Sequence, residues 1–183
     1  MAKEARPIGT PFKRLFLAMS LSDSQRRAVA QWRRALELRT GKPVPAENFH
    51  VTLLFLGDVD AAQVPAWCAT IDGLAHPEAP LRLLLDRLQV WPRPGALVLE
   101  PQDTPPALRQ WVYALQQALL PLGIASQGRD YRPHLTLARD YREQLPEAAT
   151  APEFYLAARQ FTLYESRKGR YWPLAHWPLA ERP

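Results

Sequence analysis

NFHVTLLFLGDV (residues 48–59) and RPHLTLARD (132–140) are the two stretches that decide the fold. Each is an apolar run suited to a β-strand in which a histidine is followed two residues later by a threonine. Because side chains alternate faces along a strand, the histidine and threonine of each run point to one face and the apolar residues between them to the other. The sequence therefore predicts two strands, each of which presents an imidazole beside a hydroxyl.

Each of these strands is the last element of a longer unit that occurs twice. The first unit is RLFLAMSL (14–21), a helical segment around Trp32 and the first His-x-Thr strand. The second is ALVLEP (96–101), a helical segment around Trp111 and the second His-x-Thr strand. Strand-helix-strand units also recur by chance, but the motif lies at the same place in both copies, which favours a duplication. We therefore expect two similar lobes related by a pseudo-twofold axis, with the His-x-Thr strands at their interface.

Apolar periodicity and turn residues predict the other elements. The strand over 14–21 is followed by a helix capped by Ser22 or Asp23. The first His-x-Thr strand ends at Gly57-Asp58. The segments 143–155 and, at the N-terminus, 1–12 are expected to be irregular connections within a single domain spanning 1–183. The remaining predicted elements are helices over 22–39, 60–75 and 105–123, a hairpin of 81–91 with 96–101, and final strands over 159–167 and 170–179.

The composition suits a globular protein with a polyanionic partner. Lys and Arg total 23 against 18 Asp and Glu, and arginine, whose planar fork matches phosphate, supplies most of the positive charge. No apolar run is long enough to span a membrane, and no signal-peptide cleavage pattern follows the N-terminus. The single cysteine, Cys68, excludes an internal disulfide and is expected to be buried on a helix. We therefore expect a cytoplasmic protein.

Two imidazoles and two hydroxyls that meet at one cleft can perform phosphoryl chemistry. With a pKa near 6.5, one histidine can be neutral and take a proton from water while the other, protonated, gives one to a leaving oxygen. Threonine hydroxyls can donate to the phosphate oxygens.

The sequence lacks the motifs that other hydrolytic mechanisms require. The motifs contain no His-x-His or His-x-Asp pair, and His76 and His176 lie in unrelated contexts, so no metal site is predicted. The sequence also has no nucleophile elbow, no P-loop and no Lys-x-Asp-Gly of ATP-dependent ligases.

With their flanks RLFLAMSL and QFTLYESR…GRYWPL, the two motifs resemble the 2H phosphoesterases and are most similar to the bacterial RNA 2′,3′-cyclic phosphodiesterases, also called 2′-5′ RNA ligases. The resemblance covers residues 13 to 178. It implies a bilobal α+β fold in which each lobe has an antiparallel sheet and flanking helices, with the active-site cleft between the lobes. It also implies hydrolysis of a cyclic phosphate at an RNA end to a 2′-phosphate without metal, ATP or another cofactor, with reversible 2′-5′ ligation of tRNA halves as a related activity.

The resemblance assigns site residues where the motifs match. His50 is expected to protonate the departing O3′ and His134 to activate water, although the symmetry of the site makes these roles exchangeable. Thr52 and Thr136 match the phosphate-binding threonines. Arg139, five residues after His134, lies where the family has an arginine near the phosphate.

Four further residues are candidates for binding RNA. Phe16 and Phe55 match aromatic positions that could sandwich a base, with an ordinary place in the core as the equal alternative. Arg132 and Arg170 are candidates for the RNA backbone, with plain surface charge as the alternative.

Two other functions stay open at this point. One is a binding module for RNA or nucleotides that has kept the cleft without the chemistry, although both histidines and both threonines are present. The other is a 2H enzyme acting on another cyclic nucleotide, such as a cyclic phosphate of ADP-ribose, or on a 2′-5′ linkage. The expected partners are RNA with a 2′,3′-cyclic phosphate end or cyclic nucleotides, with no membrane, and the expected state is a monomer.

Overall fold

The computed structural model describes residues 11–124 and 130–179. Most of the N-terminal segment expected to be irregular, residues 1–10, lies outside the described residues, and the first strand already begins at Phe12. Among the described residues, no helix combines the length and apolar character that crossing a bilayer requires.

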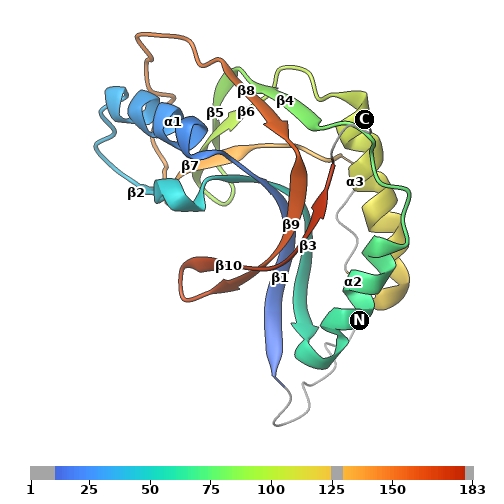
Figure 1. Cartoon of the computed structure of the whole chain (residues 1–183). Coiled ribbons are helices and arrows are strands. Elements are labelled where there is room, and N and C mark those ends of the chain that lie inside the picture. Colours follow the sequence, from blue (N-terminus) through green and yellow to red (C-terminus); the bar gives the residue numbers. More distant parts are fainter. Residues whose placement is uncertain (1–10, 125–129, 180–183) are drawn as a thin grey trace.

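Two four-stranded antiparallel sheets form the framework, as expected for an α+β fold of two lobes (Figure 1). The first has the order β10-β9-β1-β3 and the second the order β2-β7-β6-β5, while β4 and β8 form a separate pair. In both copies of the repeated unit the leading strand pairs antiparallel with the His-x-Thr strand, β1 with β3 and β6 with β7. The strands are β1 (Phe12–Ser20), β2 (Lys42–Pro43), β3 (His50–Asp60), β4 (Leu81–Leu85), β5 (Arg87–Trp91), β6 (Ala96–Glu100), β7 (Leu135–Arg139), β8 (Phe154–Ala158), β9 (Gln160–Arg167) and β10 (Arg170–Pro178).

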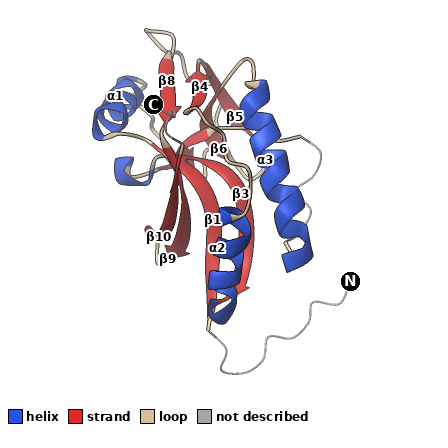
Figure 2. Cartoon of the chain, turned by 45° about the vertical axis from the view of Figure 1, so that its right-hand side comes forward, coloured by secondary structure: helices blue, strands red, loops and turns tan. Residues whose placement is uncertain are grey.

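The three α-helices form where apolar periodicity predicts them, and they lie on opposite sides of the sheets. They are α1 (Asp23–Ala35), α2 (Val64–Asp72) and α3 (Pro106–Leu119), with short 3-10 helices η1 (Ala46–Asn48), η2 (Ala61–Gln63) and η3 (Leu120–Leu122). Ser22 caps α1 through a capping box with Gln25. Figure 2 shows α2 and α3 on one side of the β1–β3 sheet and α1 away from them.

The helix of each unit contacts the sheet of the other unit. The helix α1 follows β1, yet Arg33 on it donates to the carbonyl oxygen of Leu137, in β7 of the other sheet. The helix α3 follows β6, yet Trp111 on it packs against Phe161 of β9, with ring centroids 5.5 Å apart. Buried residues of both sheets therefore belong to one continuous core, which fixes the two His-x-Thr strands relative to each other.

Four details of the predicted elements are wrong. The segment 143–155 is not irregular to its end, because β8 begins at Phe154. The first helix ends at Ala35 and not at Arg39. Residues 81–91 are two strands and not one: the chain breaks at Asp86, β4 pairs with β8, and only β5 forms the predicted hairpin with β6. The strand β3 does not end at Gly57-Asp58 but continues to Asp60, because Gly57 adopts φ +77° at an irregularity of the β1–β3 pairing.

Candidate active site

Both histidines and both threonines of the two motifs line one cavity of about 850 Å³ between the sheets, together with Arg139. His50 begins β3, and His134 directly precedes β7. The structure thus brings together the five residues that the sequence assigned to the phosphate.

A β-bulge in each strand extends the face that carries the motif. In β3, Thr52 pairs with Ala18 and Leu54 with Leu17, so Leu53 is an extra residue and the next exposed side chain on the motif's face is Phe55.

The strand β7 repeats this geometry. Thr136 pairs with Val98 and Ala138 with Leu97, so Leu137 is the extra residue. Without the bulge, the alternation along a strand would place Arg139, an odd number of residues after His134, on the opposite face. The bulges therefore explain why the fifth residue after each histidine reaches the cavity.

The two imidazoles are held in the same way. The Nδ1 atom of His50 lies 2.8 Å from the carbonyl oxygen of Asn48, and Nδ1 of His134 lies 2.9 Å from that of Arg132. A carbonyl only accepts, so Nδ1 carries the proton in both rings and Nε2 is left for proton transfer. Nε2 of His50 lies 2.9 Å from the hydroxyl oxygen of Thr52.

The surroundings disfavour the charged form of both rings. Burial lowers the pKa of His50 to about 4; the hydrogen bond to the Asn48 carbonyl opposes this shift, and the nearby charges of His134 and Arg139 add to it. Burial also lowers the pKa of His134, against the hydrogen bond to Arg132 and the carboxylate of Glu100. Since a bound anion favours a protonated ring, a phosphate in the cavity would raise both pKa values.

Aromatic rings frame the histidines. Phe16 is buried, with its ring centroid 5.1 Å from that of His50 and 5.0 Å from that of Tyr171. Phe55 is 54% exposed, and its ring lies 6.3 Å from that of Phe16 at an angle of 45°. The two phenylalanines touch rather than face each other across a gap, and of the two it is Phe55 whose side chain is exposed at the cavity.

The three candidate arginines differ in their places. Arg139 lines the cavity and donates to the hydroxyl of Tyr171 at 3.2 Å. Arg132 lies over the ring of Trp91 at 4.5 Å and binds the buried carboxylate of Glu100 at 3.0 Å. Arg170 begins β10 and does not line this cavity, so the structure does not bring it to the site.

Two aromatic residues next to the histidines were not predicted. The ring of Trp91 lies 4.2 Å from that of His134, and the ring of Tyr171 lies 5.1 Å from that of His50. Tyr171 thus joins Phe16 beside His50, and Trp91 is the aromatic neighbour of His134. Tyr171 lies within the quoted segment GRYWPL, but nothing local in the sequence separates it from a core residue.

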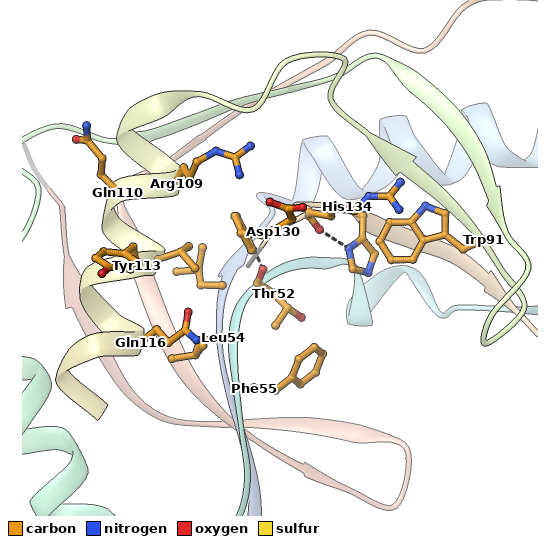
Figure 3. Close-up of a pocket in the computed structure, with 14 residues that line it drawn as sticks. Thr52, Leu54, Phe55, Trp91, Arg109, Gln110, Tyr113, Gln116, Asp130 and His134 are labelled. Carbon is orange, nitrogen blue, oxygen red and sulfur yellow. Dashed lines mark hydrogen bonds between the residues drawn. The ribbon is translucent and has the colours of Figure 1, made fainter. Parts of the chain in front are cut away.

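A second cavity, of about 570 Å³, adjoins the first (Figure 3). The two share Thr52, Phe55, Trp91 and His134, whereas His50 lines only the larger one. The point between the histidines is therefore open to a second space on the His134 side.

Among the described residues, no three His, Cys, Asp or Glu side chains are grouped closely enough to hold a metal ion. The expectation of a metal-independent reaction stays a prediction.

A family model described as LigT like Phosphoesterase matches residues 19–98 and again residues 99–174. The chain belongs to the LigT-like phosphoesterases. The double match agrees with the duplicated unit, and membership in this branch of the 2H superfamily is what the two motifs predicted.

Relatives and solved structures of this phosphoesterase agree with the assignment. This chain is 31% identical to the RNA 2′,3′-cyclic phosphodiesterase of Escherichia coli (strain K12), a match that covers 92% of the chain and 98% of that protein. It is 26% identical to the enzyme of the same name from Geobacillus stearothermophilus, over 92% of the chain and 58% of that protein.

The fold is likewise similar to solved structures. The crystal structure of Escherichia coli LigT complexed with 3′-AMP matches with a TM-score of 0.83 at 31% identity, over 92% of this chain and 99% of that one. The crystal structure of TT0787 of Thermus thermophilus matches with a TM-score of 0.75 at 25% identity, over 92% and 100%. The predicted 2H phosphoesterase fold is confirmed.

Proposed function

We propose that this phosphoesterase hydrolyses the 2′,3′-cyclic phosphate at an RNA end to a 2′-phosphate, by acid-base catalysis with His50 and His134 and without metal or ATP. The observation that carries the proposal is the pair of imidazoles, held alike through Nδ1, that line one cavity with two threonine hydroxyls. The names of the relatives, RNA 2′,3′-cyclic phosphodiesterases, support the substrate.

In the proposed reaction the cyclic phosphate lies between the two Nε2 atoms. The hydroxyls of Thr52 and Thr136 donate to its non-bridging oxygens, and the guanidinium of Arg139 offsets its charge. His134 takes a proton from water, the new P–O bond forms, the P–O3′ bond breaks, and His50 gives its proton to O3′. The phosphate stays bonded to O2′, which yields the 2′-phosphate.

The assignment of His134 as the base is supported by the second cavity. Because that space opens at His134 and not at His50, a nucleophile can approach from the His134 side while O3′ departs on the His50 side. With a pKa of about 4, His50 is neutral at pH 7 before substrate binds, so the charge of the phosphate must stabilise its protonated form.

Hydrolysis of a nucleoside 2′,3′-cyclic monophosphate in the presence of EDTA tests the function. We expect the His50→Ala and His134→Ala variants each to lose activity, whereas His176→Ala, a histidine of β10 outside both cavities, retains it. Tight binding without turnover by the wild-type protein would instead support the non-catalytic binding module. A requirement for added divalent metal would contradict the two-histidine reaction.

A substrate with sulfur in place of O3′ separates the two roles. A thiolate leaves without a proton, so the substitution removes the need for a general acid but not for a general base. We expect the sulfur substrate to restore turnover by His50→Ala and not by His134→Ala. The reverse pattern would make His50 the general base and His134 the general acid.

RNA ends such as those of tRNA halves, reversible 2′-5′ ligation, a monomeric state and a cytoplasmic location belong to the same proposal. An RNA end suits the basic side chains at the rim of the larger cavity, among them Arg14 and Lys42.

A further inference from the structure

The proposed hydrolysis needs only a water molecule where the smaller cavity opens at His134, and it leaves the rest of that cavity unused. One wall is the face of α3 that carries Tyr113 and Gln116, and the other is formed by β3 and residues 130–132 (Figure 3). Thr52 and His134 lie where this cavity meets the larger one. A water molecule needs far less than 570 Å³, so the cavity has room for a second group beside the phosphate.

The lining suits a nucleobase. Phe55 and Tyr113 are large aromatic residues that are 54% and 62% exposed, and both line this cavity. Gln110 and Gln116 add amide donors and acceptors from α3, as in ligand sites where a few polar groups orient an otherwise apolar ligand. Exposed aromatic faces beside such groups are how proteins stack unpaired bases.

The walls of the cavity are held in place, and its lining carries two arginines and one aspartate. The hydroxyl of Tyr131 donates to the backbone carbonyl of Thr52 at 2.7 Å, which fixes the segment before His134 against β3. Arg109, one turn into α3, and Arg132 place guanidinium groups at the same cavity, where Asp130 supplies one carboxylate. A ligand with an aromatic base and a chain of phosphates matches this combination better than a purely apolar ligand does.

We propose that the smaller cavity is an acceptor subsite for a second nucleoside, whose 5′-oxygen it places on the phosphorus from the His134 side. This inference rests on the proposed function, because it uses the same cyclic phosphate and the same two histidines. It adds the place where the second strand binds and the residues of α3 that select it.

Ligation at this subsite needs no cofactor, because the two histidines carry both protons. In ligation, the 5′-hydroxyl of the acceptor gives its proton to Nε2 of neutral His134 and its oxygen bonds to phosphorus. The P–O3′ bond breaks, and protonated His50 supplies the proton that O3′ takes up. In the reverse direction, neutral His50 takes the proton of the 3′-hydroxyl, O3′ displaces O5′, and protonated His134 gives its proton to O5′.

Two substrates that differ only in the second nucleoside test the subsite. Adenosine 2′,3′-cyclic monophosphate lacks the acceptor nucleoside, and adenylyl-2′-5′-adenosine carries it. We expect Gln116→Trp, which places an indole ring where the base would lie, to lower kcat/KM for adenosine release from the dinucleotide by about tenfold or more, the effect of losing one stacked base. The variant should hydrolyse the cyclic mononucleotide at the wild-type rate, which also shows that it is folded.

A matched control and a second variant complete the design. Gln117→Trp places the same side chain one residue on, at an exposed position of α3 outside both cavities, and should leave both reactions unchanged. Tyr113→Ala removes an aromatic face without filling the cavity and should weaken dinucleotide cleavage in the same selective way.

The possible outcomes separate this inference from the proposed function. Equal losses on both substrates, no loss on either, or a wild-type enzyme that hydrolyses the cyclic mononucleotide but never cleaves the dinucleotide would each overturn the subsite. A wild-type protein that cleaves the dinucleotide with dependence on Gln116, yet does not hydrolyse the cyclic mononucleotide, would support the subsite and refute the proposed hydrolysis.

Discussion

Binding of a nucleoside 2′-monophosphate, the proposed product, should turn His50 from a neutral into a protonated ring near neutral pH. In the unliganded protein the pKa of His50 is about 4, chiefly because the ring is buried. A phosphate charge about 4 Å from the ring, at an effective dielectric constant of about 20, stabilises the imidazolium by about 4 kcal/mol. At about 1.4 kcal/mol per pKa unit, this raises the pKa by about 3, to about 7.

Nuclear magnetic resonance of the histidine ring nitrogens measures this change directly. The pH titration is carried out with and without the nucleotide, and His176, which lines neither cavity, serves as the internal control. Because Nδ1 of His50 already carries a proton for the Asn48 carbonyl, the added proton should appear at Nε2. A His50 pKa near 6.5 in the free protein, or one that the nucleotide leaves unchanged, would show that burial and bound phosphate do not control this ring.

Three further predictions follow from the same geometry. The free energy of unfolding should fall as the pH drops from 6.5 to about 4, by up to about 3 kcal/mol from His50 alone, because the unfolded chain gains a proton there that the folded ring does not; denaturant titrations of the wild type and His50→Asn should show the smaller fall in the variant. Thr52→Val and Thr136→Val should each lower kcat by about 10²-fold, the cost of one donor to the phosphate, with a melting temperature close to wild type; variants that fail to fold would make these hydroxyls structural. Arg139→Gln should raise KM by about tenfold through the loss of a charge-assisted hydrogen bond to phosphate, and steady-state kinetics that show an unchanged KM would remove Arg139 from the site.

The local pattern of the sequence was sufficient for the elements and for the centre of the site. Strict spacing in the two motifs placed each histidine beside its threonine. Apolar spacing located α3, in which the periodic apolar residues are buried: Leu108, Trp111, Val112, Leu115 and Leu119. The family assignment depended on the same local residues.

What the sequence could not predict depends on contacts between distant segments. Simple alternation places Phe55 and Arg139 on the face opposite to the histidines, and only the bulges at Leu53 and Leu137 bring them to the cavity. A bulge is set by the register with the neighbouring strand, which no local pattern encodes.

Contacts between distant segments also explain the other features that the sequence did not predict. The run 81–91 looks continuous because the choice of β8 as the partner of β4 is made across the fold. The crossing of α1 and α3 between lobes was also hidden, because an apolar helix face does not say which sheet will cover it. Trp91 reaches His134 only through the position of the β5–β6 hairpin.

The identity of the product from a short RNA with a 2′,3′-cyclic phosphate end is the sharpest test of the proposed hydrolysis. Phosphorus nuclear magnetic resonance in the presence of EDTA distinguishes a 2′-phosphate from a 3′-phosphate. We expect a single 2′-phosphate that forms with the wild type and not with His50→Ala or His134→Ala. A 3′-phosphate, or turnover that persists in either variant, would contradict it.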